Sequence, residues 1–228
     1  MAEIRRTYHE QLDELRHEVV HLGALATEAI GAGTEVLLDS DLAGADRVIS
    51  QDAVLDSLTH SIEERSYILL ARQQPVATDL RMIIAVLRTI HEFERVGDLM
   101  LNVAKTTRRL YPRPLPPLVR GIIDRMGQQA ATQMRTAVES FAESDAAMGV
   151  ALVDMDDVMD ELQLELFRAI FSIAGSDDAN VHWAVQVALV GRYYERIADH
   201  AVNVGQRVAY MVTGELPSDS GIDEVALA

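Results

Sequence analysis

The stretch Glu94-Arg95-Val96-Gly97-Asp98, with Asn102 four residues beyond it, decides the fold, because the chain repeats it 101 residues later. The second copy is Glu195-Arg196-Ile197-Ala198-Asp199, with Asn203 beyond it. In both copies Glu, Asp and Asn are four residues apart, so on a helix they form one row of oxygen donors. A single row of this kind decorates many solvated helices, whereas two matched copies indicate an internal repeat.

The repeat extends toward the beginning of each half. Asp52 and Asp56 have counterparts in Asp156 and Asp160, 104 residues further along the chain. Each half therefore carries two aspartates four residues apart, followed by the row of Glu, Asp and Asn. Self-similarity of this kind indicates that the same structural unit is built twice. The sequence predicts two homologous halves, joined by Tyr111-Pro112-Arg113-Pro114-Leu115-Pro116-Pro117.

Proline positions and apolar spacing divide each half into three long helices. All six prolines lie between or beyond strongly helical stretches, where proline is tolerated. No segment alternates with period two over a useful length, so no sheet is expected. We expect Asp41 to cap the second helix. The expected helices span residues 6–39, 41–74, 76–111, 117–143, 145–173 and 178–213.

Helices of this length with short connections pack in antiparallel fashion, so the predicted fold is all-α, with two tandem homologous three-helix bundles. The last helix carries an apolar stripe at steps of three and four, formed by Val190, Tyr194, Ile197, Ala201, Val204 and Val208. We assign residues 1–111 to the first bundle, 112–117 to a proline-rich linker and 118–214 to the second bundle. We expect residues 215–228 to be a disordered tail.

Composition argues against several classes of protein. The chain has 228 residues, no Cys and a formal net charge of −16. Disulfides, thiolate metal sites and Cys nucleophiles are therefore ruled out, and the charge disfavours nucleic-acid binding, which needs clustered Lys and Arg. The first residues lack an apolar signal core, and no apolar run is long enough to span a bilayer. We expect a cytoplasmic protein that does not insert into a membrane.

The acidic rows predict cation sites. If each middle helix lies beside the helix that follows it, four carboxylates meet on one accessible patch in each half, and such charges repel one another without a counter-charge. Arg95 and Arg196 follow the glutamates but project about 100° away, so we expect them to be poor partners for the row as a whole. Gly97 and Ala198 either admit close neighbours or serve helix packing. Oxygen-rich sites suit a divalent or trivalent metal such as Mg, Ca, Mn, Fe or Zn, and bridging carboxylates suit a multinuclear one.

An enzymatic alternative is a carboxylate-bridged di-iron oxidase built in a helical bundle. Such proteins use a Glu-x-x-His pair on each of two different helices. Here Glu14-x-x-His17 and Glu18-x-x-His21 both lie on the first helix, which favours polar decoration of that helix. His91 and His200 flank the acidic rows, and we expect them to be surface histidines. We therefore predict that the protein is not an enzyme; an adaptor whose acidic rows bind nothing is a third alternative.

Two stretches resemble the signature of the PhoU family, in particular of its actinobacterial members. They are Gln74-Pro75-Val76-Ala77-Thr78-Asp79-Leu80-Arg81, which leads into the first acidic row, and Glu195-Arg196-Ile197-Ala198-Asp199-His200-Ala201-Val202-Asn203-Val204. The resemblance implies a cytoplasmic accessory protein that acts as a negative regulator of phosphate uptake and of the phosphate-starvation two-component response. The implied partners are the phosphate ABC transporter ATPase and the phosphate sensor histidine kinase, and a homodimer is expected.

The resemblance also implies which side chains bind metal. Carried over by position, the ligands are Asp52, Asp56, Glu94 and Asp98 in the first half and Asp156, Asp160, Glu195 and Asp199 in the second. Asn102 and Asn203 are further candidate ligands. One departure from symmetry is that Asp79 falls opposite Asn180, and we expect this difference to make the two sites unequal in charge and occupancy.

Overall fold

The structure is a computed structural model that describes residues 2–173 and 178–215, and within these ranges it contains six α-helices and no strand. All six expected helices are present, and the first begins at Ala2 rather than near Arg6. The predicted disorder of the tail concerns residues that lie, from 216 onward, outside the described part. The helices are α1 (Ala2–Asp39), α2 (Leu42–Gln73), α3 (Ala77–Leu110), α4 (Pro117–Glu143), α5 (Ala146–Ile173) and α6 (Asp178–Thr213).

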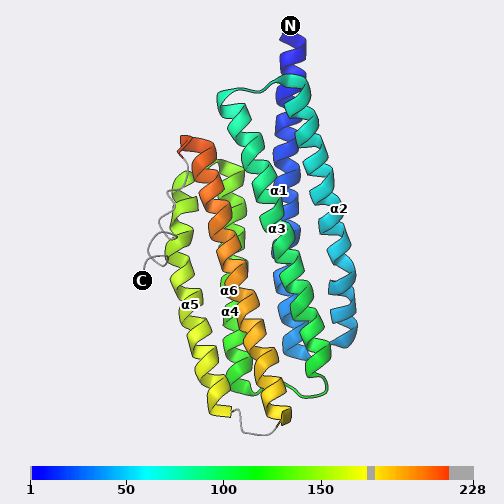
Figure 1. Ribbon diagram of the computed structural model, residues 1–228, viewed down its shortest axis with the longest axis vertical. Helices are drawn as coiled ribbons and strands as arrows, with labels where there is room; N and C mark the ends of the chain where they lie inside the picture. The colour runs from blue at the N-terminus through cyan, green and yellow to red at the C-terminus, as the bar shows by residue number, and fades with distance from the viewer. Residues whose placement is uncertain (1, 174–177, 216–228) are drawn as a thin grey trace, which may run out of the picture.

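Each half is an antiparallel three-helix bundle, and the two bundles pack side by side (Figure 1). Helices α3 and α6 lie next to each other at the centre, with α1 and α4 behind them. Helices α2 and α5 form the two outer edges. In the described residues α2 packs only on α1 and α3, and α5 packs only on α4 and α6. The all-α prediction of two three-helix bundles is therefore confirmed.

The hydrophobic core runs without interruption through both halves. The predicted stripe of α6 is fully buried, and so is Phe93 on α3. A buried hydrogen bond of 2.8 Å joins the hydroxyls of Thr34 on α1 and Tyr194 on α6. Because the Thr34 hydroxyl already donates to the Ile30 carbonyl oxygen, the Tyr194 hydroxyl donates to Thr34. The two bundles thus share one core instead of meeting across a polar surface.

The turn that joins the first two helices has the same backbone conformation at its serine in both halves. Ser40 and Ser144 both adopt the left-handed conformation with φ of 54°. In the second half the Asp145 carboxylate accepts hydrogen bonds from the backbone N–H groups of Ala147 and Met148, and so caps α5. Asp41 occupies the N-cap position of α2 as predicted, but its carboxylate makes no capping hydrogen bond and pairs with Arg47 at 3.4 Å instead.

Two arginines related by the repeat fasten the bundles to each other. Arg16 of α1 reaches across to the end of α4, where its guanidinium donates to the Phe141 and Ala142 carbonyls and to the Ser144 hydroxyl. Arg120 of α4 does the same at the end of α1, with the Leu38 carbonyl and the Asp39 carboxylate as acceptors. Each guanidinium satisfies backbone carbonyls that a helix end leaves without partners.

Helices α5 and α6 approach each other closely where two glycines meet. A Cβ atom on Gly205 would lie 2.3 Å from the backbone oxygen of Gly149, and one on Gly149 would lie 2.7 Å from that of Gly205. This contact brings the backbone of α5 against that of α6 and positions the acidic side chains of the two helices on neighbouring turns. In the part of the chain that is described, no helix is apolar over a length that would cross a bilayer.

Candidate metal centres

The first acidic cluster lies between α2 and α3, in the first bundle. Asp52 and Asp56 come from α2, and Glu94 and Asp98 come from α3. The two helices approach at Gly97, where an added Cβ atom would lie 2.6 Å from Leu55 Cδ1 and 3.3 Å from Asp52 Oδ1. The glycine therefore serves both purposes considered for it, since it allows the helices to pack and leaves room for a carboxylate oxygen beside α3.

One carboxyl of this cluster, that of Asp52, has a perturbed pKa. Burial raises the pKa of Asp52 above its ordinary value, and the carboxylates of Asp56, Asp98 and Glu94 raise it further. Lys105 is the neighbour that lowers it. All four acidic residues predicted for this half are thus brought together by the fold.

The second acidic cluster lies between α5 and α6 and is more strongly perturbed. The pKa of Asp156 is raised to about 6, chiefly by burial and then by the charges of Asp199 and Asp160. Burial and the charge of Asp199 also raise the pKa of Glu195. Burial raises the pKa of Asp199 as well, although Arg192 and His200 act in the opposite direction. The fold again brings together the four predicted acids, Asp156, Asp160, Glu195 and Asp199.

Two carboxylate oxygens of the second cluster are buried without a hydrogen-bond partner among the described residues. They are Asp156 Oδ1 and Glu195 Oε2. The fully buried Gln133 of α4 lies beside Asp156 and lowers its pKa, yet neither polar atom of its amide forms a hydrogen bond of ordinary geometry. A buried carboxylate oxygen without a donor is costly, and a cation would supply the missing interaction.

Basic residues of the same helices hold several of the carboxylates. Arg95 pairs with Asp98 at 3.0 Å, and Arg192 pairs with Glu195. Arg95 projects away from the preceding Glu94, as expected, but Asp98 lies three positions further on, on the same side of the helix as Arg95, so this arginine holds one carboxylate of the row. His91 binds Glu94 at 3.0 Å. In this arrangement no three acidic or histidine side chains of the described chain converge closely enough to hold an ion.

The two asparagines lie in different surroundings. The Asn102 amide donates to the backbone oxygen of Asp98 and stays on the cluster's own helix. The Asn203 amide instead donates to Glu92 of α3 at 3.2 Å, away from the other acids of α6. Each step of four residues advances the side chain about 40° around a helix. The asparagine at the end of each row therefore points in a different direction from the glutamate at its beginning.

His200 is not the surface histidine that we expected. Its side chain is only 12% exposed, and its Nδ1 lies 2.7 Å from Glu92 Oε2. Glu92 thus joins α3 to α6 through both His200 and Asn203. Glu92 lies outside the repeated row, and only the packing of α3 against α6 gives it these partners. Arg192 also lies outside the row, and its partner Glu195 is three residues further along the same helix.

The departure from symmetry at Asp79 and Asn180 does not reach the acidic clusters. Asp79 lies in the first turn of α3, about 22 Å along the helix axis from Glu94 at 1.5 Å per residue. Asn180 lies near the beginning of α6, where its side-chain oxygen accepts a hydrogen bond of 2.9 Å from Arg113. The two clusters differ instead in the exposure of their carboxylates, since Asp160 and Asp199 of the second cluster are exposed. They differ also in Gln133, which lies beside Asp156 of the second cluster.

In donor chemistry the residues fit a hard or borderline cation. Each cluster offers four carboxylates and no thiolate, a set typical of Mg, Ca, Mn and Fe sites. Burial is the first cause of the raised pKa of Asp52 and of Asp156, and neighbouring carboxylates add to it in both clusters. The second cluster alone also contains buried carboxylate oxygens without a hydrogen-bond partner among the described residues. For a cation to bind, the carboxylates held by Arg95, Arg192 and His91 would have to turn toward the centre of each cluster.

Comparison with known proteins matches most of the chain to one family. The family model of the PhoU domain matches twice, over residues 19–107 and 123–208. The phosphate-specific transport system accessory protein PhoU homolog 1 of Mycobacterium leprae is 37% identical over 96% of this chain and 98% of its own length. Homolog 2 of Mycobacterium tuberculosis is 38% identical over 94% of this chain and 100% of its own length.

Two solved structures share the six-helix arrangement. The crystal structure of PhoU from Pseudomonas aeruginosa superimposes with a TM-score of 0.85 and 26% identity, covering 91% of this chain and 100% of that one. The phosphate transport system regulatory protein PhoU from Streptococcus pneumoniae superimposes with a TM-score of 0.84 and 25% identity, covering 92% of this chain and 99% of that one.

Proposed function

Because the chain belongs to the PhoU family, we propose that it is a cytoplasmic accessory protein of a phosphate transport system that regulates by binding and transforms no substrate. The observation that carries this proposal is that both halves match the family and that mycobacterial accessory proteins align with the chain over nearly their whole lengths. The fold itself could serve many purposes, so the proposal depends on this full-length similarity together with the paired acidic clusters.

The proposed partners are the ATPase of the phosphate ABC transporter and the phosphate sensor histidine kinase. When phosphate is plentiful, the protein would bind both and suppress phosphate uptake and the starvation response. Such coupling requires the protein to bind one state of a partner more tightly than another. The outer helices α2 and α5, each packed on one side only, leave long surfaces for these contacts and for a homodimer.

We further propose that divalent or trivalent cations occupy the two acidic clusters and so shape the binding surface. The support is electrostatic: four carboxylates in each cluster, with the pKa of Asp156 raised to about 6. In the first cluster the cation would compete with Arg95 for Asp98, and in the second with Arg192 for Glu195. Release of these arginines on metal binding would change the charge that each bundle presents to a partner.

The di-iron oxidase alternative receives less support from the side chains it needs. Both of its Glu-x-x-His pairs lie on α1, and the carboxylates of Glu14 and Glu18 bind the Arg65 guanidinium of α2. An iron ligand of that class would project into the bundle with a matching pair on another helix. Consumption of dioxygen by the iron-loaded protein would favour this alternative over the regulatory one.

The proposed function is tested by capture of the sensor kinase on immobilised protein, at high and at low phosphate. We expect stronger capture at high phosphate, and weaker capture by the double variant Asp98→Ala, Asp199→Ala. The matched control is Asp13→Ala, Asp154→Ala, which removes two exposed aspartates outside the clusters. Equal capture at both phosphate levels would reject phosphate-dependent binding. Unchanged capture by the cluster variant would show that the clusters play no part in it.

A further inference from the structure

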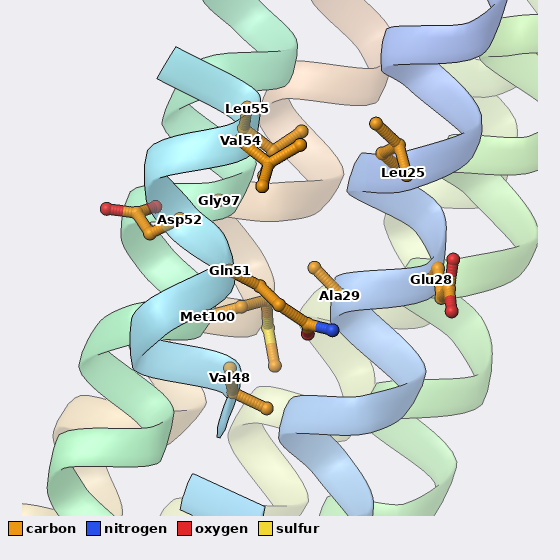
Figure 2. A pocket seen from close by; sticks show the side chains of 10 residues that line it. All are labelled: Leu25, Glu28, Ala29, Val48, Gln51, Asp52, Val54, Leu55, Gly97 and Met100. Atoms are coloured by element: carbon orange, nitrogen blue, oxygen red, sulfur yellow. The ribbon is translucent and has the colours of Figure 1, made fainter. Parts of the chain in front are cut away.

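A pocket opens between α1, α2 and α3, on the side of α2 that faces α1 (Figure 2). Figure 2 shows Gln51 extending from α2 toward Ala29 of α1, whereas Asp52 points away from α1. The pocket is therefore separate from the interior of the first acidic cluster, although Gly97 and Asp52 border both. Its apolar lining is formed by Leu25, Ala29, Val48, Val54, Leu55 and Met100.

The pocket has the size of one apolar group. It encloses about 130 Å³, and an apolar cavity of about 150 Å³ is large enough to hold a benzene molecule. Val54 at its edge is 56% exposed, so part of the apolar lining faces water. A Leu or Phe side chain entering from outside would remove that surface from water and fill the space between the helices.

An acidic cavity continues from this pocket along α1 and α2. It encloses about 240 Å³ and shares Glu28, Val48 and Gln51 with the first pocket. Its carboxylates include Asp39 and Asp41, which pair with Arg120 and Arg47. The other two, on Glu28 and Glu35, have no ion pair among the described residues. The combined groove thus offers an apolar hole next to exposed negative charge.

Two of the residues that line the pocket are smaller than their counterparts in the second half. Position 29 corresponds to position 133, where the second half has the fully buried Gln133 instead of Ala29. Position 97 corresponds to position 198, where it has Ala198 instead of Gly97. Both differences replace a larger side chain with a smaller one in the first half. The three-helix bundle does not require small side chains at these two positions, because the second half builds the same fold with larger ones.

We propose that this groove is a docking site for a basic amphipathic segment of a partner protein. One apolar side chain of the segment enters the pocket beside Ala29, and a Lys or Arg side chain lies over Glu28 and Glu35. Binding of an amphipathic helix in a groove between two helices is a common mode of recognition. The occupant is basic because the groove and the whole chain are acidic, with a net charge of −16. This inference goes beyond the proposed function, since it needs neither phosphate nor metal.

The probe is a fluorescent synthetic helical peptide that carries one Phe on its apolar face and several Lys on the other. Its affinity for the full chain is measured by fluorescence anisotropy at low and moderate salt. Two control peptides replace Phe with Ala, or Lys with Glu. We expect the Phe peptide to bind about tenfold more tightly than the Ala peptide, and the Glu peptide not to bind. Added salt should weaken binding without abolishing the advantage of Phe.

Substitutions in the protein locate the binding site. Ala29→Leu fills the pocket and should weaken the Phe peptide about tenfold, whereas Ala24→Leu, on an exposed position of the same helix, should not. Ala29→Gln, which introduces the residue of the second half, is a second filling variant in case Leu disturbs α1. Glu35→Gln should reduce the salt dependence of binding, and its repeat counterpart Glu139→Gln should not.

Each remaining outcome overturns the proposal. Equal affinity of the Phe and Ala peptides would mean that only charge attracts them. Undiminished binding to both Ala29 variants would place the site elsewhere. Uptake of benzene by the pocket together with no peptide binding would assign it to small apolar molecules. Because the assay contains no transporter, kinase or phosphate, its failure is distinguishable from failure of the proposed function.

Discussion

Replacement of Asp156 by Asn should stabilise the metal-free protein at neutral pH. In the folded protein Asp156 has a pKa of about 6 instead of 3.8, because of burial and the charges of Asp199 and Asp160. The folded state therefore keeps a proton that the unfolded chain has lost, and stability falls as pH rises from about 4 to about 6. This difference in pKa corresponds to about 3 kcal/mol in full. Asp156 is only half-buried, so solvent screening reduces the expected gain to about 1 kcal/mol.

The assay is thermal unfolding followed by circular dichroism, on protein freed of metal with a chelator. At about pH 7.5, Asp156→Asn should unfold about 2–4 °C above the wild type. At about pH 4.5 the difference should shrink to roughly a third, because the folded wild type is then protonated at Asp156 and the unfolded chain begins to keep the same proton. Asp154→Asn, an exposed neighbour on α5, should change neither value. Destabilisation by Asp156→Asn at pH 7.5, or an equal gain at both pH values, would refute the electrostatic account of the cluster.

Two further predictions concern the fold. Arg16→Ala should lower the free energy of unfolding, measured by urea titration, by about 2 kcal/mol, because three acceptors at the end of α4 lose a charged donor. Arg120 is more exposed, so Arg120→Ala should lower the same free energy by about 0.5 kcal/mol. Equal losses of stability in the two variants would contradict the argument that the more buried arginine contributes more. Gly205→Ala should cost about 2 kcal/mol, because its Cβ would meet the backbone of α5. Gly121→Ala, with open space around it, should instead stabilise α4 by about 0.5–1 kcal/mol, and destabilisation there would contradict the helix-propensity argument.

Much of the fold could be predicted because its information is local and periodic. The apolar stripe of α6, spaced by three and four residues, proved fully buried from Val190 to Val208. Prolines and the repeated Ser-Asp turns marked where helices end, and duplication fixed the number of helices in each half. The sequence could not show whether the aspartate of each turn caps the next helix, since Asp145 does so and Asp41 forms an ion pair instead.

The sequence predicted which residues form the candidate sites but not which contacts their side chains make. Spacing along the sequence placed four acids of each half on two helices, and the fold brings those acids together. Spacing could not show which carboxylates Arg95 and Arg192 hold, because rotamers decide that choice. Nor could it show that Asn203 and His200 bind Glu92, because that contact depends on how one bundle packs against the other. Interactions between the bundles leave no periodic pattern in the chain.

The most direct test of the account is a titration of the metal-free protein with Mn²⁺, with bound metal measured by equilibrium dialysis and elemental analysis. The account predicts uptake by both clusters of the wild type. Asp98→Ala should abolish binding in the first bundle alone, Asp199→Ala in the second alone, and the double variant should bind none. Uptake by the double variant equal to that of the wild type would contradict the claim that the paired acidic rows are cation sites.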